Sequence, residues 1–231
     1  MRFVKKFFRK IPFYQKIVFT ILIVDVIFIV LHFLIGQRIY LFHLDFEKNI
    51  PTLFQGFKLI FLSSLIFSWI LILFIKKRKI LWLFFPAMIF FMFLALDEVG
   101  QLHEEVYSIS IHLFESKTSS FLGFFTSFGY HSSYWVLLYL PLIFLAFFYF
   151  IFLLFYFYKN KIDSRILLLS LFCLGSVILL EVLGTTDKNF NQNTYNFIMP
   201  MEELMEMVGV TLFIGFIMIN LRKEIIKIEK Q

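Results

Sequence analysis

Long apolar runs, separated by short polar or basic segments, fill almost the whole chain. An α-helix needs about 20 apolar residues to cross a hydrocarbon core of about 30 Å, and each run is close to that length. The pattern predicts an all-α fold, a polytopic integral membrane bundle of six transmembrane helices that forms one domain over residues 1–231, with no soluble domain. The six runs cover residues 17–35, 57–75, 80–96, 134–158, 166–183 and 201–221.

The first apolar run follows a basic segment, as the apolar part of a signal peptide does. Residues 1–16 carry six Lys or Arg residues. The run is long enough to span a membrane and no small-residue cleavage site follows it, so we expect an uncleaved first helix. Pro86 and Pro141 are expected to kink their helices, whereas Pro200 stands where the first turn of a helix favours proline.

Lysine and arginine are concentrated in alternate connections. Seventeen of the 22 lie in residues 1–16, 76–79, 159–165 and 222–230. Short loops rich in these residues stay in the cytoplasm, so both termini are predicted to be cytoplasmic. The net charge of +6 is therefore a topology signal and does not indicate nucleic-acid binding. The five basic residues assigned to the opposite, outer side are Arg38, Lys48, Lys58, Lys117 and Lys188.

The composition agrees with a membrane protein. Hydrophobic residues make up 60% of the chain, and the mean hydropathy is +0.84. A soluble domain of this size cannot bury so much apolar surface, so the lipid bilayer is the first expected partner. The single cysteine, Cys173, lies in an apolar run, which excludes an intramolecular disulfide and a cysteine-based metal site.

Acidic and imidazole side chains collect on the outer side of this predicted topology. All five histidines and twelve of the sixteen carboxylates fall in outer loops or in the outer halves of the spans. Such a face suits divalent cations or protons and repels anionic substrates that lack a metal bridge.

Depth makes the pattern sharper. With a rise of 1.5 Å per residue, four helices each place one ionisable group roughly 22–26 Å above the cytoplasmic end of the span. These groups are His32, Asp97, Glu181 and Glu206. Charged groups avoid lipid, so we expect the carboxyl groups of Asp97 or Glu98, Glu181 and Glu206 to lie within about 10 Å of one another.

No Lys or Arg is expected at this depth, since Lys188 and Arg38, the nearest by sequence, are placed in outer loops. Several carboxylates in a low dielectric then require protons or a metal ion as compensation. Because the histidines share the face, a metal is the favoured answer. Its candidate ligands are His32, Asp97, Glu98, His103, Glu104, Glu181, Glu202 and Glu206.

Several of these residues have a simpler interpretation. A hydrogen bond between helices would account for Asp25. Glu202 and Glu203, after Pro200, suit a first helical turn, where the dipole favours carboxylates. On a regular helix His103 points about 100° away from its nearest acidic neighbour, so either the helix breaks near Gly100 or His103 faces another helix. The 107–133 connection is interpreted as a membrane-surface connector or as a lid over the site.

Two acidic motifs carry a resemblance. LDE-x4-HE at 96–104 and EE-x2-E-x2-G at 202–209 resemble segments of a group of uncharacterised small bacterial multi-pass membrane proteins. The resemblance implies a bacterial inner (cytoplasmic) membrane location and supplies no activity. It singles out Asp97, Glu98, His103, Glu104, Glu202, Glu203, Glu206 and Gly209.

Three functions remain open from the sequence. The first is a metal-dependent membrane hydrolase of lipid-like substrates, in which zinc, manganese, iron or calcium activates water and Glu98 or Glu206 is the general base. The second is a cation or proton transporter or channel, with Asp25 as a lower station. The third is a non-catalytic assembly or partner protein whose acids hold helices together.

Overall fold

The computed structural model describes residues 12–36, 38–44, 48–77, 79–102, 105–106, 134–185 and 192–229. Within these ranges it is entirely helical, as the sequence predicts, with no strand. The α-helices are α2 (Phe13–Leu31), α3 (Ile50–Ile75), α4 (Phe85–Gly100), α7 (Tyr134–Lys159), α8 (Arg165–Thr185) and α9 (Gln192–Glu229). Three shorter elements are the π-helix η1 (His32–Gly36) and the 3₁₀-helices η2 (Tyr40–Phe42) and η3 (Lys79–Phe84).

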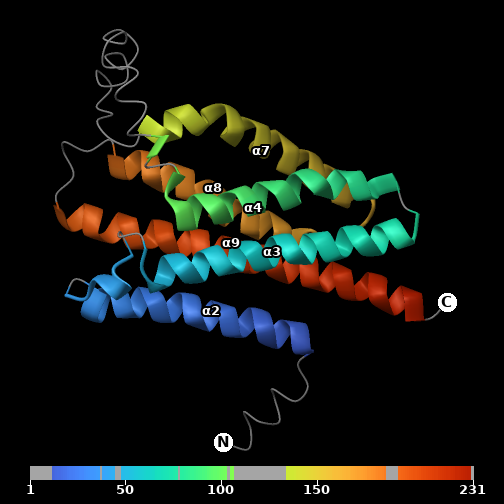
Figure 1. Ribbon diagram of the computed structural model, residues 1–231, viewed down its shortest axis with the longest axis horizontal. Helices are drawn as coiled ribbons and strands as arrows, with labels where there is room; N and C mark the ends of the chain where they lie inside the picture. The colour runs from blue at the N-terminus through green and yellow to red at the C-terminus, as the bar shows by residue number, and fades with distance from the viewer. Residues whose placement is uncertain are drawn as a thin grey trace, which may run out of the picture.

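The helices run side by side along the long axis of the molecule (Figure 1). The 38-residue α9 is central, because it packs against α2, α3 and α8, and α3 in turn packs against α4. At one end of the bundle, α3 and α7 end, α4 and α8 begin, and the C-terminus is found. We call this the basic end, because it carries Lys76, Lys77, Lys159 and Arg165. The opposite end, where α4 finishes beside the start of α3, is the acidic end.

Within the described residues, five helical segments are long and apolar enough to cross a membrane. Side chains on their outer surfaces are apolar and exposed, as lipid contact requires; Leu145 of α7 and Phe13 of α2 are 68% and 77% exposed. The five segments are Phe13–Gly36, Ile50–Ile75, Trp82–Gly100, Tyr139–Lys159 and Asn196–Glu229.

The main core fills the half of the bundle nearer the basic end. Aromatic rings from four helices meet there: Phe91 contacts Phe213 with ring centroids 4.7 Å apart, and Phe157 contacts Phe216 at 5.1 Å. Trp69 of α3 stacks on Phe157 and is 4% exposed. This aromatic core ties α3, α4, α7 and α9 together.

The start of α3 differs from the prediction. The helix begins at Ile50, seven residues before the expected Phe57, because Asn49 caps it and Pro51 suits the first turn. The Asn49 side chain accepts a hydrogen bond from the Thr52 backbone N–H at 3.0 Å. The early start places Lys58 well inside the helix and not in an outer loop.

Two proline predictions are corrected. Pro86 lies in the first turn of α4, directly after η3, so it starts that helix and does not kink it. Pro200 lies inside α9, which begins at Gln192 and not near Pro200. Glu202 and Glu203 are therefore not in a first helical turn, and the dipole explanation for them fails.

The end of α4 answers the question about Gly100. The helix finishes at Gly100, and Gln101 adopts a left-handed backbone with φ 57°. Asp97 and Glu98 consequently stand in the last turn, where the helix dipole disfavours negative charge and other groups must compensate.

The connection between α7 and α8 is held by a local ion pair. Arg165 donates from its guanidinium to Asp163 at 2.9 Å and from its backbone N–H at 3.2 Å. These hydrogen bonds lower the pKa of the Asp163 carboxyl to about 2, so it stays charged at physiological pH.

Candidate functional site

A buried ion pair lies inside the bundle, in the half nearer the acidic end. The Lys58 ammonium of α3 is 2.7 Å from Asp25 Oδ1 of α2, and the two side chains are 3% and 0% exposed. Lys58 also donates to the Met207 carbonyl oxygen of α9 at 3.0 Å. Thr211, one turn further along α9, donates from Oγ1 to Asp25 Oδ2 at 2.7 Å. One lysine thus joins three helices.

This pair corrects the prediction that the layer holds no Lys or Arg. Lys58 was assigned to the outer side because the span was expected to begin at Phe57. With the helix starting at Ile50, its ammonium lies among the carboxylates and supplies part of their counter-charge. Asp25 does have the interhelical hydrogen bond that its simpler interpretation required.

A second polar contact lies one helical turn from Lys58, toward the acidic end. Gln55 of α3 donates from Nε2 to Glu206 Oε1 of α9 at 2.9 Å. Gln55 is 2% exposed, and within the described residues its Oε1 is buried without a hydrogen-bond partner. Residues three apart on a helix share a face, so Gln55 and Lys58 both meet α9.

The electrostatic field at Lys58 has three acidic sources. Asp25 contributes most, followed by Glu206 of α9 and Glu98 of α4. Glu98 and Glu206 are both half-buried. Carboxylates from three different helices therefore act on one ammonium.

Asp97 faces a different neighbour from Glu98. Tyr139 of α7 donates from its hydroxyl to Asp97 Oδ1 at 3.2 Å. This bond compensates part of the unfavourable position of Asp97 at the end of α4. The two adjacent acids thus serve different sides of α4, one toward α7 and the other toward α3.

His32 has a structural task. Its Nδ1 accepts a hydrogen bond from the Leu44 backbone N–H at 3.1 Å, and the side chain is 3% exposed. The ring lies edge-on to His43, with centroids 4.9 Å apart. The proposed ligand role of His32 stays a prediction.

For the remaining predicted site residues, the structure gives the helix and the degree of burial at most. Glu181 of α8 and Glu202 and Glu203 of α9 are half-buried, on two helices that pack against each other. His103, Glu104 and the 107–133 connection lie outside the described residues. Among the residues that are described, no group of three or more His, Cys, Asp or Glu side chains is arranged to hold a metal ion.

Gly209, singled out by its motif, has a packing role. A Cβ there would lie 2.8 Å from Cγ of Leu174 on α8, and Ser170 Oγ donates to the Gly209 carbonyl oxygen at 2.7 Å. Small residues let membrane helices approach closely, so this glycine sets the contact between α8 and α9.

A known family model matches the part of the chain that makes these contacts. Residues 16–221 match the family described as a domain of unknown function, DUF8692. The chain belongs to the DUF8692 family. We call the hydrogen-bonded residues Asp25, Gln55, Lys58, Glu206, Met207 and Thr211 the Lys58 network. The matched region contains all of them. No curated protein and no solved structure matches the DUF8692 chain.

Sequence reasoning missed three members of this network: Gln55, Lys58 and Thr211. The available signal was the pairing of Asn49 with Pro51, which is typical of a helix start and would have drawn residues 50–56 into the span. Gln55 and Lys58 would then have stood as two polar residues on one face of a membrane helix.

Proposed function

We propose that this DUF8692 protein is a six-span integral protein of the bacterial inner membrane whose acidic end, on the outer side, binds a divalent metal ion. The sixth span in this proposal is α8, with 21 residues. The orientation is supported by the seventeen of 22 basic residues that fall on one side, which puts both termini in the cytoplasm.

The charge balance around Lys58 carries the metal proposal. Lys58 is engaged by Asp25, while Glu98 and Glu206 act on the same ammonium from two other helices. Several carboxylates that approach one another in a low dielectric favour binding of a proton or of a further cation. Glu98 and Glu206 would hold a divalent ion that supplies this positive charge.

The donor chemistry is consistent with a hard or borderline metal. Glu98 and Glu206 offer carboxylate oxygens, and the buried Gln55 Oε1 offers a neutral amide oxygen, a set that suits calcium or manganese. Asp97, His103, Glu104, Glu181, Glu202 and His32 complete the proposed ligand candidates. The histidines extend the range to zinc or iron.

The reaction class we propose is hydrolysis of an ester-type bond in a lipid-like substrate. The metal ion would lower the pKa of a bound water, and Glu98 or Glu206 would accept its proton as general base. The water oxygen would bond to the carbonyl carbon or phosphorus, the bond from that atom to the alcohol oxygen would break, and the proton would pass from the glutamate to the leaving alcohol.

Passage of cations or protons through the membrane is the second candidate. The depth of the Asp25–Lys58 pair favours it, since intramembrane charges often mark such routes. The aromatic core opposes it, because Trp69, Phe157 and Phe216 fill the bundle between this pair and the basic end. Proton or cation flux in proteoliposomes tests this candidate directly.

Elemental analysis of the purified protein tests the metal proposal. We expect a stoichiometric divalent metal, and we expect Glu206→Gln and Glu98→Gln each to lower metal binding and the metal-dependent gain in melting temperature. Glu224→Gln is the control, since Glu224 pairs with Lys76 at the basic end, 2.7 Å away. A metal-free protein whose melting is unchanged by zinc, manganese, iron or calcium would refute the proposal.

A further inference from the structure

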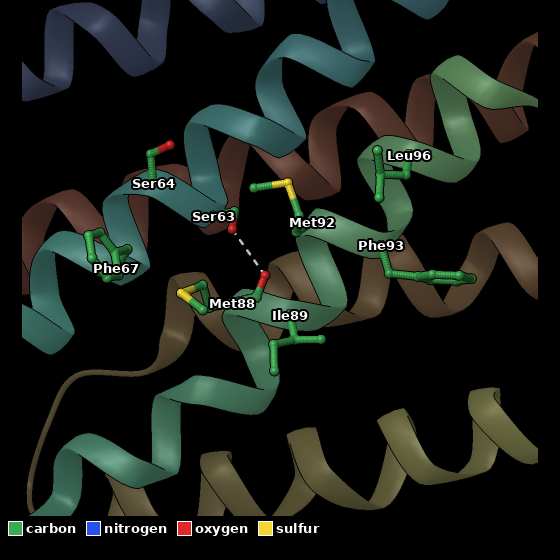
Figure 2. Close-up of a pocket in the computed structure, with 8 residues that line it drawn as sticks. All are labelled: Ser63, Ser64, Phe67, Met88, Ile89, Met92, Phe93 and Leu96. Carbon is green, nitrogen blue, oxygen red and sulfur yellow. Dashed lines mark hydrogen bonds between the residues drawn. The ribbon is translucent and has the colours of Figure 1, made fainter.

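A groove of about 370 Å³ lies between α3 and α4. Figure 2 shows side chains from both helices along it, with Ser63 and Ser64 on the α3 side. The groove opens to the outside of the bundle, where Ile89 and Leu96 are 61% and 59% exposed. Its lining includes Ser64, Phe67, Met88, Ile89, Met92 and Leu96.

The two serine hydroxyls do not make the groove polar. Ser63 donates from Oγ to the Met88 carbonyl oxygen at 3.0 Å, and Ser64 donates to the Ile60 carbonyl oxygen at 2.9 Å. Both hydroxyl protons are thus used by backbone acceptors. The groove therefore suits a hydrocarbon chain and not a hydrogen-bonding ligand.

The groove lies within two membrane-spanning segments, and one end of it is at the level of Asp97 and Glu98. α3 and α4 are both long and apolar enough to cross a membrane. Leu96 lines the groove and immediately precedes Asp97 and Glu98. A lipid tail held in the groove would thus have its polar end at the same level as the carboxylates.

The groove is large enough to bind a single acyl chain but too small to accommodate an α-helix. A helix with its side chains is about 10–12 Å across, too large for a hollow of this volume, whereas small-molecule sites start at about 300 Å³. Met88 and Met92 are unbranched and flexible, so they can follow an irregular acyl chain.

We infer that the α3–α4 groove binds one acyl chain of a membrane phospholipid and presents its head group to the acidic site. This inference rests on the proposed function, because it names the substrate class of that site. A phosphate head group would reach the carboxylates through the metal ion, since the acids alone repel it.

Photolabelling tests the groove in the full-length protein. The protein is reconstituted in vesicles of phosphatidylethanolamine and phosphatidylglycerol that contain a phospholipid with a diazirine in its acyl chain, without added metal. We expect Met88–Leu96 to be labelled several-fold more than Phe144, Leu145 and Phe148 of α7, which are exposed to bulk lipid. Equal labelling of the two surfaces would overturn the inference.

A matched pair of variants locates the chain. Ser64→Phe fills the groove, whereas Ser68→Phe places the same ring one turn away, outside it. Both serines are exposed and donate to the carbonyl oxygen four residues earlier, so the local structural change is the same. We expect Ser64→Phe, and Met92→Trp from the α4 side, to reduce groove labelling to the α7 level while Ser68→Phe does not. Equal effects of Ser64→Phe and Ser68→Phe would contradict the inference.

Added Mn²⁺ separates this inference from the proposed function. If the groove and the metal site are both real, Mn²⁺ increases groove labelling in the wild type and not in Glu206→Gln. Enriched labelling that Mn²⁺ does not change supports acyl-chain binding in the groove and overturns the metal site. Metal binding without enriched labelling supports the metal site and overturns acyl-chain binding in the groove. Efficient disulfide cross-linking of two Met92→Cys chains in place of lipid labelling would show a second copy there and overturn the acyl-chain inference.

Discussion

Removing the Lys58 charge should destabilise the protein more than removing any comparable surface lysine. In Lys58→Met the stem is replaced by an apolar chain of similar length, and Asp25 is left fully buried without its cation. Loss of one partner from a buried ion pair costs about 3–5 kcal/mol. For a chain of this size that is on the order of 10 °C in melting temperature.

The control is Lys76→Met on the same helix. Lys76 pairs with Glu224 at the same 2.7 Å distance, but its side chain is 14% exposed and stands at the end of α3. A pair with access to water contributes about 1 kcal/mol or less. Both variants are compared by thermal unfolding in one detergent, with helix content and intrinsic fluorescence as the signals.

A double variant separates charge from packing. Lys58→Met with Asp25→Leu removes both charges, and Thr211 keeps the Met207 carbonyl oxygen, 2.9 Å away, as an acceptor. We expect it to be more stable than Lys58→Met alone, because the buried Asp25 carboxylate that lost its cation is removed as well. Strictly additive losses, or a Lys58→Met loss no larger than that of Lys76→Met, would refute the ion-pair reasoning.

Three further predictions concern other contacts. Gly209→Ala should cost about 1–3 kcal/mol by overpacking against Leu174, while Gly175→Ala, where a Cβ meets open space, should not destabilise; melting temperatures compare them. Tyr139→Phe should cost about 1 kcal/mol in unfolding free energy by removing the bond to Asp97, and an unchanged stability would contradict that bond. Single cysteines in the connections at 37–49, 107–133 and 186–191 should react with an impermeant reagent from outside, and protection of any one of them would contradict the predicted topology.

The helices could be predicted because membrane spans depend on long apolar runs that composition alone reveals. Their ends could not be predicted as well. The start of α3 depends on the Asn49 cap, and α9 extends from Gln192 to Glu229 through polar residues that hydropathy assigns to loops. At the start of α3, local hydrogen bonding sets the helix end and hydrophobicity does not.

The level of Lys58 could have been predicted from the sequence if the start of α3 had been known. Counting 17 residues up from Ile75 puts Lys58 roughly 26 Å above the end of α3, in the layer proposed for the acids. It could not be predicted that Lys58 pairs with Asp25 and not with Glu206. The lysine side chain is long enough to contact acids at different heights in the bundle. The height of a residue along its span also does not reveal how each helix is rotated about its axis. Convergence of Glu181 with Glu206 and Glu98 within about 10 Å stays a prediction.

The Lys58–Asp25 pair also bears on how the chain enters the membrane during synthesis. A lone lysine or aspartate in the middle of a span costs about 2.5–3.5 kcal/mol at the translocon. Asp25 and Lys58 are only 33 residues apart and lie on the first two spans, whereas Thr211 is made 153 residues after Lys58. We expect α2 and α3 to insert together as a hairpin whose charges are already matched, long before α9 arrives to enclose them.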